Sequence, residues 1–501
     1  MNIRMFHHAG KRHSKKRALF IWLIPALVLS LFVLVSGCSR GEPVVLPSES
    51  AKGMSLESLY VKGSVSILTV TGGVFRVDSE TGTVEIRQRI GKERPLAEVT
   101  LAGGELKGMA APTQMADSVL WGGSSPESPK MIISRDSVIH FQNIKNMTVK
   151  FLFSPMYHKF KDTNGGLLAL DDTGGLAIIP PETNLSDSWR RTFDDNFWQL
   201  RGDEPLPFLF IGVCPPRQFD WERSLMPVVH YSSHIQRYPT DEQIIGYSQY
   251  ARVLEMHSWV WQNRYDPNDQ IELEPYMEGK APLWMDKSYL AQDYKWIPDD
   301  EAELKRVIST CHKYGMKFVP YVNMISGDLE TQMAEMKWLK DTYGIDGVYM
   351  DGLYNDKPEL AYEAARALRE LFGEDGWLTL HNTRWSGYFF PFVNTYFDLI
   401  VTGEHQPFDR WTSTEYNISN AIASLWPEIP LSVKDGREFL KKLVDESLRY
   451  NNRVMFMTGE QGQWRQWRLY FTEDEMSFMQ EYYLGALKRL SATIPGAQKS
   501  G

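Results

Sequence analysis

The stretch Gly344-Ile-Asp-Gly-Val-Tyr-Met-Asp-Gly-Leu-Tyr354 decides the fold of this chain. Its middle, from Gly347 to Met350, is small and apolar except for one tyrosine hydroxyl. Such a run is typical of a parallel strand that is buried on both faces. The run ends at an acid, Asp351, and an acid there costs free energy to desolvate unless the site uses it. We therefore expect Asp351 to lie at the carboxyl end of a buried strand and to carry chemistry.

Strands alternate with amphipathic helices on both sides of this stretch, across residues 206–495. The sequence predicts eight strands, at 227–231, 254–261, 317–323, 347–351, 377–382, 399–404, 429–433 and 453–458. The clearest helices are expected at 299–314, 329–343, 358–372 and 436–450. Eight such units predict an α/β fold, a (β/α)8 TIM barrel, and favour it over a doubly wound open sheet. Pro320 lacks a backbone donor, so we expect a bulge within the third strand.

The region in front of the predicted barrel has a different pattern. Residues 56–205 carry short runs of alternating or β-branched residues, separated by glycine-rich turn sequences. Several strands at short spacing predict a β-sandwich domain. This region contains no catalytic constellation, so we expect it to support the barrel or to line part of a cleft.

The amino terminus has the pattern of a secretory signal. A basic region precedes an apolar run over 18–35, which ends in Leu34-Val-Ser-Gly-Cys38. This ending resembles the lipobox of bacterial lipoproteins, which implies a signal peptide over 1–37 and a lipid on Cys38. Residues 38–55 are then a tether. We expect a lipid-anchored protein of the bacterial cell envelope, at the outer membrane if the cell is Gram-negative, facing the periplasm or the exterior. An uncleaved membrane anchor is the alternative.

Composition narrows the function classes. The chain has 501 residues and a net charge of -9, which argues against a nucleic-acid partner. It contains no phosphate loop, zinc signature or nucleophile elbow, so the sequence predicts no metal and no cofactor. Its 16 tryptophans suit either sugar-binding clefts or a large core. Cys214 and Cys311 leave two alternatives, a disulfide or two buried free thiols.

Polar side chains gather near the ends of the predicted strands, where barrel active sites lie. They are His257, Asn323, Asp351, His381, Asn382 and Glu404. Asp351 ends the fourth strand and Glu404 the sixth, so the two carboxylates start roughly 10 Å apart along the wall. Inward-pointing side chains would lie closer. Retaining glycosidases need about 5–5.5 Å between the carboxylates and inverting ones about 6.5–9.5 Å. This placement permits either outcome.

The motif Gly-Ile-Asp-Gly-Val-Tyr-Met-Asp-Gly resembles the strand-four motif of clan D retaining α-glycosidases, which include α-galactosidases and α-N-acetylgalactosaminidase-like barrel enzymes. The family nucleophile maps onto Asp351. Glu404, in Thr402-Gly-Glu-His405, takes the acid/base position by strand count. The resemblance implies an exported glycoside hydrolase, retaining and α-specific, that acts on an oligosaccharide or polysaccharide. The chain departs from the family in lacking an obvious C-terminal β-domain.

The resemblance also implies roles for the other polar and aromatic residues. Sugar hydroxyls would be bound by His257, Asn323, His381 and Asn382. His405 would tune Glu404 or bind substrate, and Trp259 or Trp261 would stack on the sugar ring. Two alternatives stay open: a surface lipoprotein that binds glycans without catalysis, and an endo-acting enzyme that processes exopolysaccharides.

Overall fold

The computed structural model describes most of the chain beyond residue 51. The described residues are 44–45, 52–101, 107, 109, 111–122, 125, 127–159, 167–171, 173–180, 189–218, 220–232, 236, 238–257, 261, 296–324, 327–354, 357–381, 391–402, 423–425, 429–449, 453–459, 467–468 and 470–493. The signal peptide, Cys38 and most of the tether lie outside these ranges. Residues 43–501 form one compact unit.

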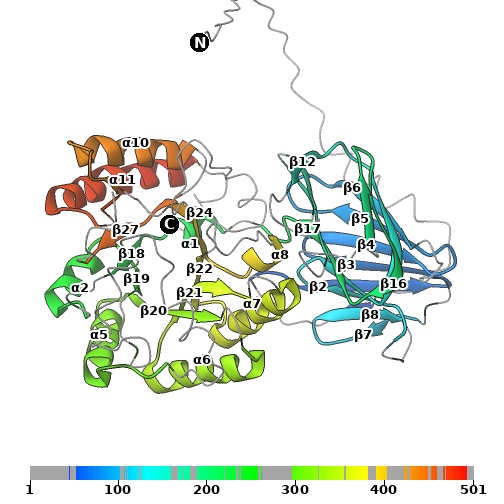
Figure 1. The fold of residues 1–501 in the computed structure, drawn as a ribbon, viewed down its shortest axis with the longest axis horizontal. Coiled ribbons are helices and arrows are strands. Elements are labelled where there is room, and N and C mark those ends of the chain that lie inside the picture. The colour runs from blue at the N-terminus through cyan, green and yellow to red at the C-terminus, as the bar shows by residue number, and fades with distance from the viewer. Residues whose placement is uncertain are drawn as a thin grey trace, which may run out of the picture. The chain divides into compact units, whose positions relative to one another are not determined.

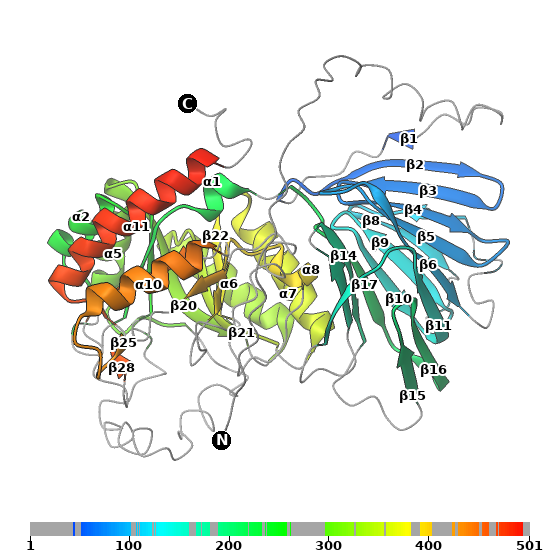
Figure 2. The same cartoon turned by 90° about the horizontal axis from the view of Figure 1, so that it is seen from above.

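The N-terminal half of this unit holds two antiparallel sheets (Figures 1 and 2). The first has nine strands, in the order β1 (Val44–Val45), β2 (Leu56–Lys62), β3 (Val65–Val70), β4 (Gly73–Asp78), β5 (Thr83–Gln88), β6 (Arg94–Leu101), β11 (Ile144–Phe151), β16 (Phe197–Leu206) and β15 (Trp189–Phe193). The second has eight, in the order β12 (Met156–Lys159), β13 (Leu167–Asp171), β14 (Gly174–Ile179), β17 (Leu209–Cys214), β10 (Val138–Gln142), β9 (Lys130–Ser134), β8 (Ser118–Gly122) and β7 (Thr113–Gln114).

The two sheets share one hydrophobic core because their strands alternate buried and more exposed residues. β3 and β5 show this period of two most clearly, and their inward residues pack with apolar residues of the second sheet. In β17 every residue is buried. Leu209 and Ile211 join the core between the sheets, whereas Phe210 packs on Phe392 with a ring-centroid distance of 5.1 Å. β17 thus buries both of its faces. The predicted division at residue 205 falls inside β16.

The second half is a parallel sheet with helices around it (Figure 1). Its strands pair in the order β26 (Arg453–Val454), β24 (Ala423–Leu425), β23 (Leu399–Thr402), β22 (Trp377–His381), β21 (Gly347–Leu353), β20 (Lys317–Met324), β19 (Val253–Met256), β18 (Val228–Tyr231) and β27 (Phe456–Thr458). Only Met455 separates β26 from β27, so the two ends of this order belong to one stretch of chain. The prediction of an α/β fold is confirmed.

The helices follow the strands along the chain. They are α1 (Trp221–Ser224), α2 (Asp241–Ser248), α5 (Glu301–Lys313), α6 (Leu329–Tyr343), α7 (Pro358–Phe372), α8 (Pro391–Asn394), α10 (Gly436–Arg449) and α11 (Glu473–Thr493). The predicted bounds of α6 and α7 are confirmed. Both starts have local causes, because Asp328 caps α6 through its side chain and proline occupies the first turn of α7.

Two strand predictions were wrong in detail. Counted along the chain from β18, the seventh strand of the parallel sheet is β24. Ile429, in the predicted seventh strand, instead lies in a short strand, β25 (Ile429–Pro430), that pairs antiparallel with β28 (Trp467–Arg468). Pro320 sits in β20 opposite Met256 without a bulge, and the irregularity falls two residues later, between Val322 and Met324. A bulge at this point changes the direction of the side chains at the carboxyl end of β20.

Both described cysteines, Cys214 and Cys311, are buried free thiols, so of the two alternatives the free-thiol one holds. Burial raises the pKa of each thiol to about 12. Within the described ranges, no helix combines the length and apolar character needed to cross a membrane.

Candidate functional site

The site is organised by the inward face of β21. Gly347, Tyr349 and Asp351 alternate along this strand and share one face, and Asp351 pairs in register with His381 of β22. A β-carbon on Gly347 would lie 1.6 Å from the backbone oxygen of Trp377, so only glycine permits this approach of the two strands. Gly352 follows Asp351 with a φ of 89°, which bends the chain directly after the acid.

Asp351 is held from both neighbouring strands. Its Oδ2 accepts a hydrogen bond of 2.6 Å from the Tyr321 hydroxyl on β20. Its Oδ1 lies 2.8 Å from Nδ1 of His381 on β22. The Asp351 side chain is nevertheless 34% exposed, whereas His381 is 5% exposed. The carboxylate is therefore fixed in orientation and still open to a ligand.

The surroundings of Asp351 keep it ionised. Burial alone would raise its pKa, but the imidazoles of His381 and His257 and the Tyr321 hydroxyl outweigh burial and lower the pKa well below its usual range. A carboxylate that stays charged at neutral pH suits a nucleophile or a ligand for a positive group. It does not suit a proton donor.

Aromatic rings pack beside this carboxylate. The partly buried His257 ring stacks on Tyr321 at 4.4 Å with an interplanar angle of 4°. It also lies 5.3 Å from the ring of Tyr349. His257 therefore stacks on the same tyrosine whose hydroxyl donates to Asp351. The stacked rings fix the position of the hydroxyl that Tyr321 offers to the acid.

A fully buried polar cluster lies along the same strands. Nδ1 of His230, on β18, lies 3.2 Å from Oε2 of Glu255 on β19, and its Nε2 lies 3.1 Å from Nδ1 of His257. Oε1 of Glu255 accepts hydrogen bonds from the Thr379 hydroxyl and, at 3.3 Å, from the Trp377 indole. Both Glu255 and His230 have exposed fractions of 0%. A chain of hydrogen bonds therefore joins the buried acid to the site.

Burial shifts the pKa values of this cluster toward neutral forms. It raises the pKa of Glu255 to about 7, although hydrogen bonds from Thr379 and Trp377 oppose the shift. It lowers the pKa of His230 to about 3. At neutral pH His230 is uncharged, and Glu255 is poised between its two protonation states.

Several predicted site residues lie outside the described part of the chain. They are Glu404, His405, Trp259, Asn382 and the lipidation residue Cys38. The backbone of Asn323 belongs to β20, but its side chain is also outside the description. The structure brings together three of the predicted residues, namely Asp351, His381 and His257. The pairing of Asp351 with Glu404 stays a prediction.

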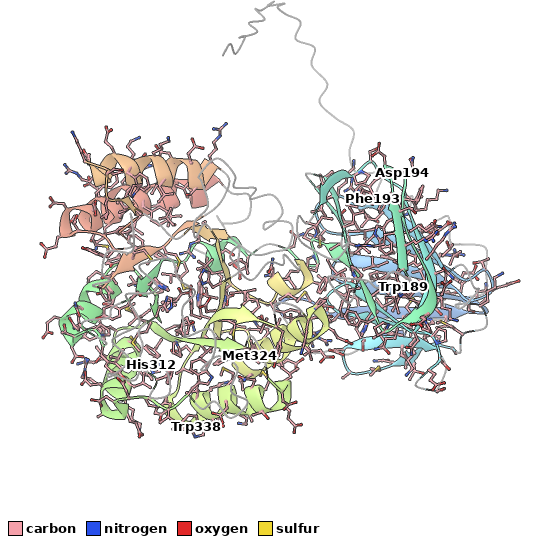
Figure 3. All side chains as sticks on the ribbon, in the orientation of Figure 1. Trp189, Phe193, Asp194, His312, Met324 and Trp338 are labelled. Atoms are coloured by element: carbon pink, nitrogen blue, oxygen red, sulfur yellow. The ribbon has the colours of Figure 1, made fainter. Side chains whose placement is uncertain are left out.

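Trp261 and Asp346 both contact groups that hold the fold together. Trp261 is 1% exposed, its indole donates a hydrogen bond of 2.9 Å to the backbone oxygen of Tyr321, and it packs on Trp296. This burial places Trp261 in the core, not on a face open to a sugar. Asp346, the other acid of the opening stretch, lies 2.8 Å from His312 and caps the Phe318 amide. Figure 3 labels His312, at the amino ends of these strands.

Sequence reasoning missed Tyr321, His230 and Glu255. A period of two points to two of them, because Glu255 lies two residues before His257 and Tyr321 two residues before Asn323. The most exposed aromatic residues are elsewhere. Trp338, 39% exposed, lies on α6, and Phe193, 42% exposed, lies on β15 with Trp189, directly before Asp194 (Figure 3).

Among the residues that the structure describes, no group of three histidine, cysteine, aspartate or glutamate side chains is arranged to hold a metal ion. Within the described ranges, the carboxylate of Asp351 has a tyrosine and two histidines as its neighbours. Proton exchange and nucleophilic attack are the reactions that these groups can supply by themselves.

Comparison with known proteins gives distant structural likenesses only. No protein-family model matches the sequence, and no curated protein matches it. A noncanonic maltogenic alpha-amylase of Thermotoga neapolitana is 10% identical, with a TM-score of 0.35 over 53% of this chain and 77% of its own. A GH31 alpha-xylosidase from a soil metagenome is 8% identical, with a TM-score of 0.35 over 86% of each chain. A phospho-2-dehydro-3-deoxyheptonate aldolase of Thermotoga maritima is 10% identical, with a TM-score of 0.32 over 63% and 97%. Likenesses at this level assign neither a family nor a reaction.

Proposed function

We propose that this chain is a glycoside hydrolase in which Asp351 is the nucleophile. The observation that carries the proposal is the state of Asp351: it is ionised, 34% exposed and oriented by Tyr321 and His381. A nucleophilic carboxylate in a retaining glycosidase needs all three properties, because it must be charged, reachable and aimed at one carbon. Its place near the carboxyl end of a parallel strand fits the active-site face of a barrel.

We also propose the finer architecture, a (β/α)8 barrel preceded by a β-sandwich. The order of pairing supports the barrel, because β18 pairs with β27 and β24 pairs with β26, and one residue separates β26 from β27. The core shared by the two antiparallel sheets supports the sandwich.

In the proposed mechanism Asp351 attacks the anomeric carbon and forms a glycosyl-enzyme, while Glu404 protonates the leaving oxygen and later deprotonates water. Glu404 follows β23 closely, and β21 and β23 both pair with β22, with His381 opposite Asp351 and Val401. This order supports a position for Glu404 two strands from the nucleophile. Specificity for α-glycosides rests on the resemblance of the strand-four motif. Asn323, Asn382 and Trp259 would bind the sugar.

Chemical rescue tests the two roles separately. Asp351→Ala and Glu404→Ala are assayed with chromogenic α- and β-glycosides, with and without azide. In a retaining α-glycosidase azide attacks the anomeric carbon of the substrate in the Asp351→Ala enzyme and gives the β-glycosyl azide. In the Glu404→Ala enzyme azide attacks the glycosyl-enzyme and gives the α-glycosyl azide.

Product stereochemistry of the wild-type enzyme, followed by NMR, is the matched control. Inverted product, or full activity of Asp351→Ala, contradicts the nucleophile role. Binding of glycans without turnover of any substrate would favour the glycan-binding alternative. Long products from a polysaccharide would favour endo action.

We further propose lipid attachment at Cys38, which the Leu34-Val-Ser-Gly-Cys38 sequence supports. Growth with labelled palmitate should label the wild-type chain and not Cys38→Ala, and only the wild type should fractionate with membranes. Equal labelling of both contradicts the proposal.

A further inference from the structure

The first antiparallel sheet carries a row of basic and amide side chains near its β15 edge. Arg190 of β15 pairs in register with Arg201 of β16, and Arg201 pairs with Asn146 of β11. Residues directly opposite each other on antiparallel strands share a face, with β-carbons about 4.5–5.5 Å apart. Leu200, the next residue of β16, is buried in the core between the sheets, so the row lies on the outer face. We call these three residues the arginine row.

This outer face lies on the side away from the parallel sheet. Phe210, on the second sheet, packs on Phe392 of α8, so the second sheet separates the first one from the parallel half (Figure 2). Stacked sheets lie about 10 Å apart. A ligand on the arginine row is therefore out of contact with a sugar bound at Asp351.

The charge of the arginine row is not balanced by a carboxylate in the described part of the chain. Arg190 and Arg201 are both exposed, and neither forms an ion pair with a described acid. Asp203 is the next residue of β16 on the same face, and no ion pair joins it to Arg201. Like charges directly opposite each other destabilise a sheet. An oxyanion between the two guanidiniums would relieve the repulsion, because each guanidinium offers a fork of N–H donors.

Asn146 extends the row with donors of fixed orientation. Its Oδ1 accepts a hydrogen bond of 3.3 Å from the backbone amide of Gly202. The two hydrogens of Nδ2 are then left to donate to another group, and a guanidinium likewise has donors and no acceptor. The side chains of the arginine row thus present donors only. Their chemical complement is a carboxylate, a sulfate or a phosphate.

A second row, two residues further along each strand, is polar and uncharged. It consists of Thr192, Gln199 and Thr148, which pair in register on the same outer face. We call it the neutral row, and it lies about 7 Å from the arginine row along the strands. Nε2 of Gln199 donates a hydrogen bond of 2.8 Å to the Thr148 hydroxyl, whose own proton is thereby directed elsewhere. Hydroxyls and amides donate and accept, as sugar hydroxyls do, so the two rows together fit an acidic sugar.

Membranes and nucleic acids fit this face less well. Recruitment to an anionic membrane takes about four to eight clustered basic residues or an inserted apolar face. Double-stranded DNA presents a phosphate about every 1.7 Å. This face offers two arginines beside uncharged residues, with exposed Asp203 and Glu204 beyond them, on a chain of net charge -9. A uniformly charged surface would be repelled, whereas a chain with spaced anions and many hydroxyls would not.

We propose that the arginine row and the neutral row form an accessory site for an acidic polysaccharide. The arginine row binds its carboxylate or sulfate groups, and the neutral row binds its hydroxyls. This inference deepens the proposed function by naming the substrate class, and it rests on that function for the choice of a sugar as ligand. Residues 43–501 form one compact unit, so a polymer held on this face has a raised effective concentration at Asp351.

The test is binding of polysaccharides to the full chain carrying Asp351→Asn, which consumes no polymer. Affinity electrophoresis measures Kd for polygalacturonate and alginate, which carry carboxylates, for carrageenan, which carries sulfates, and for neutral dextran. We expect at least one acidic polymer to bind and dextran not to bind. Adding Arg190→Gln or Arg201→Gln should raise Kd about tenfold or more, because each removes one charged fork and keeps a polar side chain. No binding of any acidic polymer overturns the site.

Arg437→Gln is the matched control, because Arg437 is an exposed arginine on α10, outside both rows. It should leave Kd unchanged. Equal weakening by Arg437→Gln and Arg201→Gln would mean attraction to overall charge and overturns the site. Urea unfolding of Arg201→Gln checks that the variant is folded, and no loss is expected since a like-charge pair is removed.

Vesicles of equal parts phosphatidylglycerol and phosphatidylcholine provide the membrane comparison. The chain used here carries Cys38→Ala, so that no lipid anchors it. Sedimentation with these vesicles that requires Arg190 and Arg201, in a chain that binds no acidic polysaccharide, overturns the proposal in favour of a lipid surface.

Kinetics separate this site from the active site. In a chain with Asp351 intact, Arg201→Gln should raise KM on an acidic polysaccharide about tenfold more than KM on a small chromogenic glycoside, which is too short to reach both sites. Binding that needs Arg190 and Arg201, in a chain that hydrolyses no glycoside, would uphold the site and refute the hydrolase. Hydrolysis that needs Asp351, without binding of any acidic polymer, would do the reverse.

Discussion

Two ionised aspartates, Asp351 and Asp398, lie at opposite ends of the parallel strands and are held in different ways. Asp398 directly precedes β23, at its amino end, and its side chain is fully buried between Lys52, Arg223 and Arg369. Asp351 lies near the carboxyl end of β21, is 34% exposed, and contacts a tyrosine and a histidine. Fixed cations close off one acid, and groups that can exchange protons surround the other. The first arrangement suits stability and the second suits chemistry.

The difference extends to how each carboxylate overcomes its burial. Burial alone would raise the pKa of Asp398, but Arg369, Lys52 and Arg223 lower it well below its usual range. Burial also lowers the pKa of Lys52, despite the attraction of Asp398. The arginine guanidiniums keep their charge at any physiological pH, so Asp398 stays ionised. Asp351 depends on imidazoles, whose charge changes with pH.

The largest effect expected is on catalysis, from Asp351→Asn. The amide keeps the shape of the side chain and removes the nucleophile, so kcat on a chromogenic glycoside should fall on the order of 10⁴- to 10⁶-fold. Stability should change little, because a partly exposed carboxylate is replaced by a polar isostere. Parallel kinetics and urea unfolding measure the two effects. A variant that loses stability in proportion to activity would remove the contrast with Asp398.

Asp398→Asn should give the opposite result. Breaking a buried ion pair leaves Lys52, Arg223 and Arg369 without their shared anion, and such a loss costs about 3–5 kcal/mol of unfolding free energy. The kcat of the folded fraction should stay within about twofold of the wild type. Urea unfolding followed by tryptophan fluorescence measures the first quantity and active-site titration the second.

The sign of the pH dependence checks the cause. Because folding lowers the pKa of Asp398, its stabilisation is fully present above the unfolded value of about 3.9 and is lost as the pH falls below it. The variant has no proton to take up at this position. The gap in unfolding free energy between wild type and Asp398→Asn should therefore narrow below about pH 4. A gap that is constant with pH would mean that lost packing, not charge, is responsible.

A smaller effect is expected from Tyr321→Phe, which removes one hydrogen bond to Asp351. A hydrogen bond to a charged group contributes about 1.5–3 kcal/mol, so kcat/KM should fall roughly 10- to 100-fold. The tyrosine hydroxyl helps to lower the pKa of Asp351, so its removal should also move the acid limb of the kcat/KM profile to higher pH. A pH-rate series on both enzymes measures this. An unmoved acid limb would show that the imidazoles of His381 and His257 keep Asp351 ionised without the Tyr321 hydroxyl.

The sequence predicted one of these two acids and not the other, for a physical reason. Asp351 interrupts an apolar strand, so its cost of burial is visible from its neighbours alone. Asp398 follows Phe397 in the same way, but its partners Lys52, Arg223 and Arg369 lie far away in the chain. Pairing over such separations leaves no mark in a single sequence.

The strands themselves show the same limit. Buried parallel strands with clear apolar runs, such as β18 and β21, were predicted within a residue or two. β24 was missed because its three residues, Ala423–Leu425, carry no such run, and nearby Ile429-Pro-Leu-Ser-Val imitated one. The missing backbone donor of Pro430 costs less in a short antiparallel pair than it would in an interior strand of the sheet. Tertiary pairing, not local pattern, chose between them.

The smallest effect is expected at a third buried acid, Asp136, which accepts hydrogen bonds from three neutral hydroxyls. It accepts hydrogen bonds from the hydroxyls of Tyr362 at 2.7 Å, Tyr396 at 2.6 Å and Ser134 at 2.5 Å, which joins the turn after β9 to α7 and to the chain after α8. Asp136→Asn should cost about 1–3 kcal/mol of unfolding free energy, because the hydroxyls can turn to donate or accept. Catalysis should be unchanged. Urea unfolding of Asp136→Asn and Asp398→Asn, measured side by side, compares the two losses. If both variants lose equal stability, burial of the acid matters more than the charge of its partners. The contrast between Asp398, held by cations, and Asp351, held by groups that exchange protons, would then have no energetic basis.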